Sequence, residues 1–291
     1  MHKGRAGIVH SVVSLDAEFL ASASSDKTVR VWHAASGVCV RVLEGHTGEV
    51  HCVAAVCAGR LASASSDKTV RMWDVISGAC LRVLEGHAGA VNGVVSLGGA
   101  LLASGSDDTT VRLWDTAGGG CVRVLDGHSG AVRCIASLGD GLLASASEDS
   151  TLRVWDVGSG MCVRELLGHA GAVLSVAALG GGQLVSASDD KTLRLWTARS
   201  GACVRVLEKH TGWVNSVTAL GGGRLASASF DTTLRVWDAS GACFRVLEGH
   251  TGWVNCVALL GDGRLASASE DGTVRLWDAA SGACERVLGG T

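Results

Sequence analysis

The stretch GHAGAVLSVAALGGGQLVSASDDKTLRLW, residues 168–196, contains a His, several Ser and two Asp, and it decides the fold because it is repeated. A close copy, GHSGAVRCIASLGDGLLASASEDSTLRVW, occupies residues 127–155, and further copies lie along the whole chain. Ser, His and Asp together form the triad of many hydrolases. An enzyme needs such a site once, with a pocket and an oxyanion hole, so a recurring set indicates a structural element.

A tryptophan marks each copy and defines the period of the repeat. Successive members of the series are 41 residues apart five times and then 40 apart, which is a period typical of four-stranded blades. The series is Trp32, Trp73, Trp114, Trp155, Trp196, Trp237 and Trp277.

Each copy contains four short runs rich in β-branched residues, separated by Gly-rich or Asp-containing turns and without helical periodicity. In the second copy the predicted strands are VHCVAAV (50–56), RLASAS (60–65), TVRMWD (69–74) and CLRVL (80–84). We therefore predict an all-β chain. One sheet of four strands is too thin to be stable alone, whereas seven such sheets bury their faces by stacking radially into a closed ring.

Units of this length that run from Gly-His to Trp-Asp resemble the repeats of the WD-repeat β-propeller family, and the resemblance covers residues 7–288. It implies a seven-bladed β-propeller with four antiparallel strands in each blade, formed as a single domain over residues 1–291. The expected blades are 7–44, 48–85, 89–126, 130–167, 171–208, 212–248 and 252–288.

The composition and charge of the chain exclude several classes of protein. It is 47% hydrophobic and 18% charged, which favours a packed core over disorder. The net charge is -3 and no run of five like charges occurs, so neither nucleic acid nor an anionic membrane is an expected partner. No stretch of about 18 apolar residues is present, and the first residues lack the apolar core of a signal peptide.

The eleven cysteines follow the repeat and do not suggest a disulfide framework. Equivalent positions of neighbouring blades are not expected to approach within the roughly 7 Å Cα separation of a disulfide, and no close pair suggests a zinc site. We interpret them as buried, unpaired thiols in a reducing compartment, which predicts a cytoplasmic or nuclear location without metal or cofactor. One position holds Cys39, Cys80, Cys121, Cys162, Cys203, Cys243 and Cys284, a second holds Cys52, Cys134 and Cys256, and Cys57 stands alone.

In the WD-repeat family a His before the first strand, a Ser in the second strand, an Asp in the next turn and the third-strand Trp form a hydrogen-bonded column in each blade. The resemblance implies this arrangement here, with the Ser drawn from pairs such as Ser63 and Ser65. A buried imidazole needs partners for both nitrogens, which a carboxylate and a hydroxyl can supply. The implied column residues are His46, His87, His128, His169, His210 and His250, then Asp26, Asp67, Asp108, Asp149, Asp190, Asp231 and Asp271, and the seven Trp of the series above.

Arginine recurs at two further positions of the repeat. Even placement around the ring and the negative net charge favour pairing with turn acids such as Asp74, Glu85 and Asp156 over a nucleic-acid groove. The third-strand set is Arg30, Arg71, Arg112, Arg153, Arg194, Arg235 and Arg275, and the fourth-strand set is Arg41, Arg82, Arg123, Arg164, Arg205, Arg245 and Arg286.

In the same family three positions of each blade face the narrow, or top, surface. Two flank the Val that begins the first strand, and the third immediately precedes the turn Asp. The first position holds Ile8, Glu49, Ala90, Ala131, Ala172, Trp213 and Trp253; the second holds His10, His51, Asn92, Arg133, Leu174, Asn215 and Asn255; the third holds Ser25, Ser66, Asp107, Glu148, Asp189, Phe230 and Glu270.

These positions differ between blades, and a specific function is expected where the copies differ. Three large aromatics fall on blades 6 and 7, and aromatic clusters beside acids are typical of protein-binding surfaces. Strand-entry packing of the two tryptophans, which share the sequence HTGWVN, is the alternative. The expected partner-binding residues are Trp213, Phe230, Trp253, Asn215, Asn255, Glu270, Asp189, Glu148, Asp107 and Arg133.

Two departures from the repeat bear on closure of the ring and on function. Arg5 stands where blade 1 would carry its His, and no strand is expected to be shared between the first and last blades as a latch. The sequence WTAR at 196–199 partly matches the W-D-x-R pattern of WD-repeat substrate receptors of cullin-type ubiquitin ligases, but the Asp is missing.

These observations predict a non-enzymatic interaction scaffold, favoured as a monomer, that binds a peptide or protein on its top face. The partner is expected to present an apolar anchor near Lys or Arg. Two alternatives are a substrate-receptor subunit of a ubiquitin ligase and a symmetric structural ring, from duplication or design, without a dedicated partner. A propeller enzyme would need a non-repeated acid–base pair, which the sequence does not offer.

Overall fold

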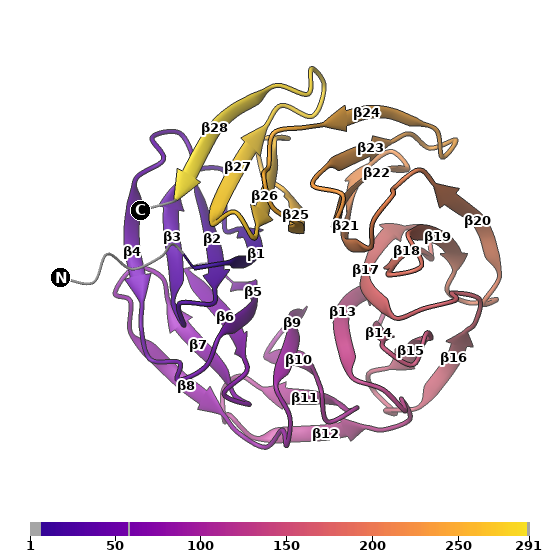
Figure 1. Ribbon diagram of the computed structural model, residues 1–291. Coiled ribbons are helices and arrows are strands. Elements are labelled where there is room, and N and C mark those ends of the chain that lie inside the picture. Colours follow the sequence, from indigo (N-terminus) through magenta and orange to yellow (C-terminus); the bar gives the residue numbers. More distant parts are fainter. Residues whose placement is uncertain (1–6, 58, 290–291) are drawn as a thin grey trace.

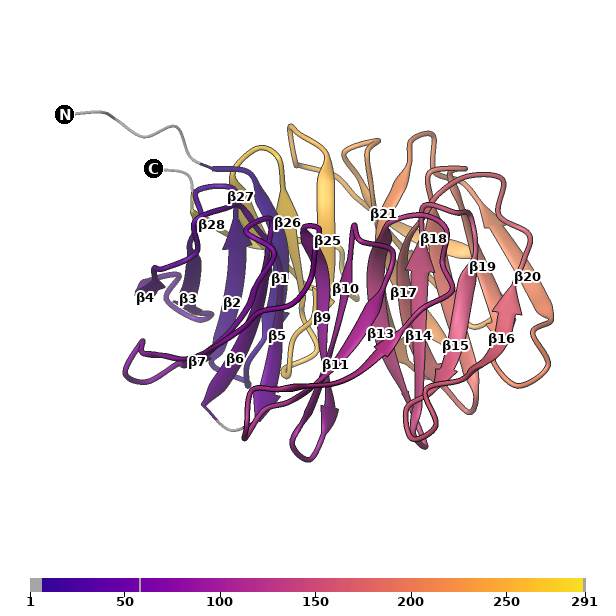
Figure 2. The same cartoon turned by 90° about the horizontal axis from the view of Figure 1, so that it is seen from below.

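The computed structural model describes residues 7–57 and 59–289, and within them the chain forms 28 strands in seven four-stranded antiparallel sheets. The sheets stand radially as the blades of a closed ring (Figure 1). Figure 2 shows the ring from the side, with the strands running across its thickness. The prediction of an all-β, seven-bladed propeller is confirmed. Within the described part of the chain, no helix is long and apolar enough to cross a membrane.

Each blade consists of four consecutive strands, paired in chain order. Blades 1 to 4 contain β1 (Val9–Ser14), β2 (Phe19–Ser24), β3 (Val29–His33), β4 (Cys39–Leu43), β5 (Val50–Cys57), β6 (Arg60–Ser65), β7 (Val70–Asp74), β8 (Cys80–Leu84), β9 (Val91–Gly98), β10 (Leu101–Ser106), β11 (Val111–Asp115), β12 (Cys121–Leu125), β13 (Val132–Gly139), β14 (Leu142–Ser147), β15 (Leu152–Asp156) and β16 (Cys162–Leu166). Blades 5 to 7 contain β17 (Val173–Gly180), β18 (Gln183–Ser188), β19 (Thr192–Thr197), β20 (Cys203–Glu208), β21 (Val214–Gly221), β22 (Arg224–Ser229), β23 (Leu234–Trp237), β24 (Cys243–Leu247), β25 (Val254–Leu259), β26 (Leu265–Ser269), β27 (Thr273–Trp277) and β28 (Cys284–Gly289).

The hydrophobic core is divided into seven layers, one between each pair of neighbouring blades. The first strand of every blade lines the centre of the ring and the fourth forms its outside (Figure 1). Both faces of the second strand are covered, and the residues of β6 after Arg60 are fully buried. In the layer between blades 1 and 2, Trp73 packs with Val29, Val31 and Leu43 of blade 1. Each blade Trp therefore stabilises a contact between blades as well as its own sheet.

The turn after the second strand is closed by its Asp. In blade 2 the backbone N–H of Thr69 donates to Asp67 Oδ1 at 3.0 Å, and the Thr69 hydroxyl donates to the same oxygen at 2.7 Å. Lys68 between them takes a positive φ of 71°. Asp is favoured in such turns because its carboxylate accepts hydrogen bonds from the backbone that follows.

A β-bulge lies at the start of the first strand in every blade. In blade 2, Val50 pairs with Ser65 and Cys52 with Ala64, so His51 has no partner across the sheet. A bulge redirects the side chain of the extra residue. The bulged residues are His10, His51, Asn92, Arg133, Leu174, Asn215 and Asn255, which are the second top-face position of the repeat.

The expectation that all the cysteines are buried is wrong. All eleven are unpaired, but the outer-strand series is exposed or half-buried because its members begin the fourth strand, at the outside of the ring. Cys52, Cys134 and Cys256 lie on first strands, and each thiol contacts a backbone carbonyl of the next blade. Burial raises the pKa of the Cys52 thiol to about 12. The exposed cysteines are Cys57, Cys80, Cys121, Cys203 and Cys284.

The predicted pairing of the fourth-strand arginines with turn acids is also wrong. Among the described residues, six of the seven, all except Arg205, donate to backbone carbonyls in the turn before the fourth strand of the next blade, as Arg123 Nη1 does to Ser159 O at 2.9 Å. The turn acid itself is already occupied, since Asp156 Oδ1 accepts bonds at 2.7 Å from the Ser159 N–H and hydroxyl. The arginines therefore tie the outer strands of neighbouring blades together.

Blade 7 meets blade 1 through the same contacts that join the other blades, and no strand is exchanged among the described residues. Asn255 Nδ2 donates to Val9 O at 3.0 Å, and Arg286 Nη1 donates to Ser36 O at 2.9 Å. The residue that the repeat aligns with the column His, Arg5, lies outside the described residues.

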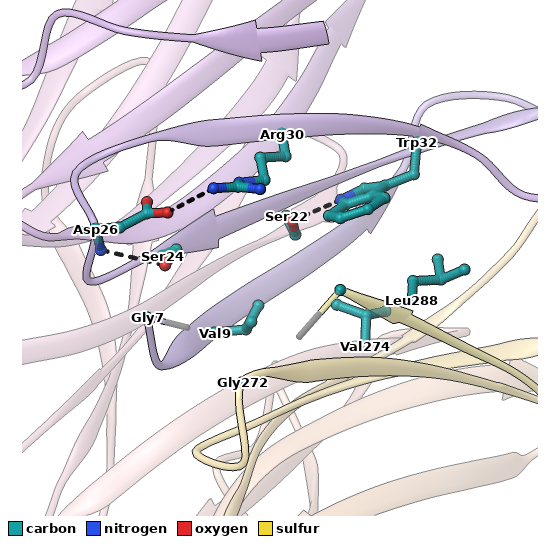
Figure 3. Close-up of a pocket in the computed structure, with 11 residues that line it drawn as sticks. Gly7, Val9, Ser22, Ser24, Asp26, Arg30, Trp32, Gly272, Val274 and Leu288 are labelled. Carbon is teal, nitrogen blue, oxygen red and sulfur yellow. Dashed lines mark hydrogen bonds and ion pairs between the residues drawn. The ribbon is translucent and has the colours of Figure 1, made fainter. Parts of the chain in front are cut away.

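A cavity of about 40 Å³ lies at this junction between blades 1 and 7. Figure 3 shows Ser22, Asp26 and Trp32 of blade 1 on one side and Val274 and Leu288 of blade 7 on the other. Asp26 Oδ2 accepts a bond from Arg30 Nη2 at 3.0 Å, whereas in the other blades this oxygen faces the column His. Trp32 is also the most exposed of the repeat tryptophans, at 7%.

This junction is expected to open more readily than the rest of the ring. Residues 7–24 and 283–288 should exchange their amide hydrogens faster than the matching strands of blades 3 and 4. The reason is that the cavity removes packing contacts and that, within residues 7–57 and 59–289, Asp26 bonds to Arg30 in place of a column His. Hydrogen exchange followed by mass spectrometry measures this directly. Uniform protection around the ring would show that the junction is as stable as the other interfaces.

Candidate functional site

Six blades contain a column of hydrogen bonds that runs from the turn Asp to the repeat Trp. In blade 2, His46 Nδ1 lies 2.7 Å from Asp67 Oδ2 and His46 Nε2 lies 2.7 Å from Ser63 Oγ. Trp73 Nε1 donates to the same Ser63 Oγ at 2.8 Å. A neutral imidazole satisfies all four side chains: its Nδ1–H donates to Asp67, and its Nε2 accepts a hydrogen bond from the Ser63 hydroxyl. The equivalent sets are His87, Asp108, Ser104 and Trp114; His128, Asp149, Ser145 and Trp155; His169, Asp190, Ser186 and Trp196; His210, Asp231, Ser227 and Trp237; His250, Asp271, Ser267 and Trp277.

Burial and hydrogen bonding set the protonation states of the column. Burial lowers the pKa of His46 and thereby favours the neutral ring. Burial alone would raise the pKa of Asp67, but hydrogen bonds from Thr69 and His46 outweigh it and hold this pKa at about 2. Ser63 is fully buried, and its hydroxyl already lies between Trp73 and His46. Such a serine cannot reach a substrate, so these sets are structural elements.

The top face is the end of the ring where each first strand begins and each second strand ends, and it carries a cluster of three aromatic rings. Trp213 and Trp253 directly precede β21 and β25, and Phe230 directly follows β22. The Phe230 ring stacks on Trp253, with centroids 3.6 Å apart and planes at 22°, and its centroid lies 4.8 Å from that of Trp213. Trp213 and Trp253 remain 47% and 42% exposed, so the cluster is open to solvent.

A funnel of about 680 Å³ occupies the centre of the top face. Its wall includes Trp213 and Phe230, whereas Trp253 stacks on Phe230 without lining the funnel. Glu270 lies in a separate hollow between blades 7 and 1. The remaining predicted partner-binding residues in the wall are Asn215, Asn255, Asp189, Glu148, Asp107 and Arg133.

Several polar side chains of the funnel form hydrogen bonds and ion pairs with one another or with the backbone. Arg133 Nε donates to Glu148 Oε1 at 2.9 Å and Arg133 Nη1 donates to Asp107 Oδ1 at 3.3 Å, so two of the expected acids are partly neutralised. Asn215 Nδ2 donates to Val254 O of the next blade at 3.1 Å and thereby also joins the blades. Burial, reinforced by the adjacent Asp190, raises the pKa of Asp189. The negative field of the funnel is therefore weaker than the sequence suggests.

His10, His51, Ser66 and Leu174 also line the funnel but were not among the predicted partner-binding residues. Three of them occupy the bulged position of their blades, and Ser66 precedes a turn Asp. The signal that identifies them is their place in the repeat, since their residue types do not by themselves suggest a binding surface.

The fold and the repeated column define a propeller built from internally hydrogen-bonded β-repeats. The family model for the WD domain, G-beta repeat, matches seven segments of the chain: 2–33, 37–74, 78–115, 119–156, 160–197, 201–238 and 241–278. The chain therefore belongs to the WD40 repeat family. The comparison with curated proteins found no match. Members of the family are generally interaction scaffolds without catalytic activity.

Proposed function

We propose that the protein is a non-catalytic scaffold that binds a peptide or a protein segment on its top face, in the funnel and against the aromatic cluster beside it. The observation that carries this proposal is the cluster formed by Trp213, Phe230 and Trp253. Three large aromatic side chains stand together in one sector of the ring, with both tryptophans open to solvent, and no other blade has an aromatic Trp or Phe side chain at these positions. Solvent-exposed aromatic clusters are typical of binding surfaces, and their few rotatable bonds limit the entropy lost on binding.

The chemistry of the surface favours a partner with an apolar or aromatic side chain next to Lys or Arg. The apolar group would pack against the three rings, and a cation would gain from their π faces. Asp189 of the same funnel, and Glu270 in the neighbouring hollow, would add charge attraction to that cation. We propose a cytoplasmic location, in which the eleven unpaired cysteines would stay reduced.

Removal of the aromatic cluster is expected to abolish partner binding without unfolding the ring. In a display screen of random peptides, the wild-type protein should enrich sequences with an apolar residue beside Lys or Arg. Trp253→Ala should weaken binding of the selected peptides by about 2 kcal/mol, which is roughly 30-fold in affinity. The fold should be kept, because this ring is 42% exposed and does not belong to the core. Fluorescence anisotropy of a labelled peptide measures the affinity.

The matched control is Phe244→Ala, which removes an aromatic ring of 45% exposure from β24 on the outside of the same sector. This variant should bind the peptides like the wild type. Equal losses in the two variants, or a screen in which the wild type and a Trp213→Ala/Phe230→Ala/Trp253→Ala variant enrich the same sequences, would remove the basis for a top-face site. The symmetric ring without a dedicated partner would then be the better interpretation.

A further inference from the structure

Two histidines and a glutamate from blades 1 and 2 converge at the top face, away from the buried columns. His10 and His51 are the bulged residues of β1 and β5, and Glu49 directly precedes β5. Nitrogen atoms of the two imidazoles and a carboxylate oxygen of Glu49 all lie within 4.8 Å of one another. His10 Nε2 is 3.4 Å from Glu49 Oε2, and the centroids of the two imidazole rings are 5.4 Å apart.

These distances are close to those of donors that share one ion. Ligands at about 2.0–2.2 Å from a tetrahedral metal ion lie roughly 3.3–3.6 Å from each other. The His10–Glu49 contact already has this length, and no two donor atoms of the group are more than 4.8 Å apart. The Glu49 side chain is 52% exposed, so its carboxylate can move towards an ion bound beside the two imidazoles.

One of the candidate ligand atoms, His10 Nε2, lacks a hydrogen-bond partner among the described residues. His10 Nε2 is buried, and within the described residues it makes no hydrogen bond, because its contact with Glu49 lacks hydrogen-bond geometry. A buried imidazole nitrogen without a partner destabilises the folded state. A cation bound between His10 and Glu49 would satisfy this nitrogen and neutralise the carboxylate.

The two histidines do not make the contact that other residues make from the same position. Asn92, Asn215 and Asn255 each donate a side-chain amide bond to the backbone of the next blade. In the described part of the chain, neither His10 nor His51 makes such a bond. Their imidazoles are therefore not needed to join the blades.

We propose that His10, Glu49 and His51 form a binding site for a divalent transition-metal ion at the mouth of the funnel. Two imidazoles with one carboxylate are donors suited to Zn²⁺, Co²⁺, Ni²⁺ or Cu²⁺, whereas Ca²⁺ and Mg²⁺ require more oxygen ligands. Three protein ligands leave at least one coordination position for water or for a donor group of another molecule. His10 and His51 also line the funnel, but the metal site does not depend on the peptide-binding proposal.

The ion Co²⁺ tests this site because its visible absorption distinguishes imidazole and carboxylate ligands from thiolates, of which the chain has eleven potential sources. The wild-type protein should bind one equivalent of Co²⁺ without a thiolate charge-transfer band, and Zn²⁺ should displace it. The His10→Ala/His51→Ala variant should lose this spectrum. Glu49→Gln should weaken binding by more than about 10-fold and cannot disturb the core, because the side chain is exposed.

The matched control is His33→Ala, which removes an imidazole of the same blade that bonds to Ser36 on another part of the surface. It should bind Co²⁺ like the wild type. The proposal is overturned if the wild type binds no Co²⁺, if the spectrum is that of thiolate ligands, or if Glu49→Gln and the double His variant bind as the wild type does. Titration without any peptide keeps this result separate from the peptide screen.

Discussion

Trp114→Ala is expected to lower the free energy of unfolding by about 3–5 kcal/mol, the loss found when a large aromatic side chain is removed from a core. Trp114 is 1% exposed and packs with Val70 and Leu84 of the preceding blade. Its indole N–H also donates to Ser104 Oγ at 2.7 Å. The substitution therefore leaves a cavity between two blades, and Ser104 Oγ loses the hydrogen bond from the indole N–H. Equilibrium denaturation in urea measures the difference.

Two further variants set the scale for this result. His128→Ala should be milder, at about 1–3 kcal/mol, because it leaves Asp149 and Ser145 without their bonds but removes less volume. Trp253→Ala should change stability little, since that ring is 42% exposed. If Trp114→Ala and His128→Ala both unfold like the parent, the column does not stabilise the ring.

The architecture could be predicted because every blade repeats the same local chemistry. A strand expected at 50–56 is observed as Val50–Cys57, and one expected at 69–74 is observed as Val70–Asp74. Alternation of small residues in RLASAS and the Asp of the following turn are local signals, and seven copies reinforce each other. The family model confirms the family that the Gly-His to Trp-Asp units resemble.

Contacts between blades were harder to predict because they join residues that local sequence patterns do not connect. Arg123 lies 36 residues before its acceptor Ser159, and it is the geometry of the ring that brings the two residues together. The same geometry exposes Cys121, which begins an outer strand, although cysteine is commonly a buried residue.

The details of the top face depend on the bulges. A regular strand alternates its side chains between two faces, whereas the bulge at His51 interrupts this alternation and changes the direction of that side chain. The family pattern indicated that Trp213, Phe230 and Trp253 share a face. The stacking of Phe230 on Trp253, a residue of the next blade, follows from the rotation between blades and has no signal in the sequence.

Acidification is expected to unfold the ring through the buried columns, and both titrating groups act in the same direction. Burial lowers the pKa of His46, His87 and His128 below the ordinary value of 6.5. Below that pH the unfolded imidazoles bind protons that the folded ones do not, so stability falls as pH falls. Hydrogen bonds outweigh burial and hold the pKa of Asp67 and Asp108 at about 2, below 3.8, so their contribution is full above pH 3.8 and is lost as pH falls towards 2.

The size of this effect follows from its repetition. One carboxylate whose pKa is lowered from 3.8 to about 2 contributes on the order of 2 kcal/mol. Hydrogen bonds also lower the pKa of Asp149, Asp190, Asp231 and Asp271. Since a domain is stable by only about 5–15 kcal/mol, protonation of part of this set is sufficient for unfolding.

Denaturant melts between pH 7 and pH 3 measure the proton uptake directly. Three shifted imidazoles predict a slope of up to about 4 kcal/mol per pH unit once the unfolded histidines are protonated, because each proton contributes about 1.4 kcal/mol per unit. His128→Gln should lower the slope by up to one proton, because it removes one of these imidazoles. A stability that stays constant from pH 7 to pH 4.5 would mean that the column imidazoles bind protons equally in both states. The neutral, doubly hydrogen-bonded ring on which the column depends would then be the wrong assignment.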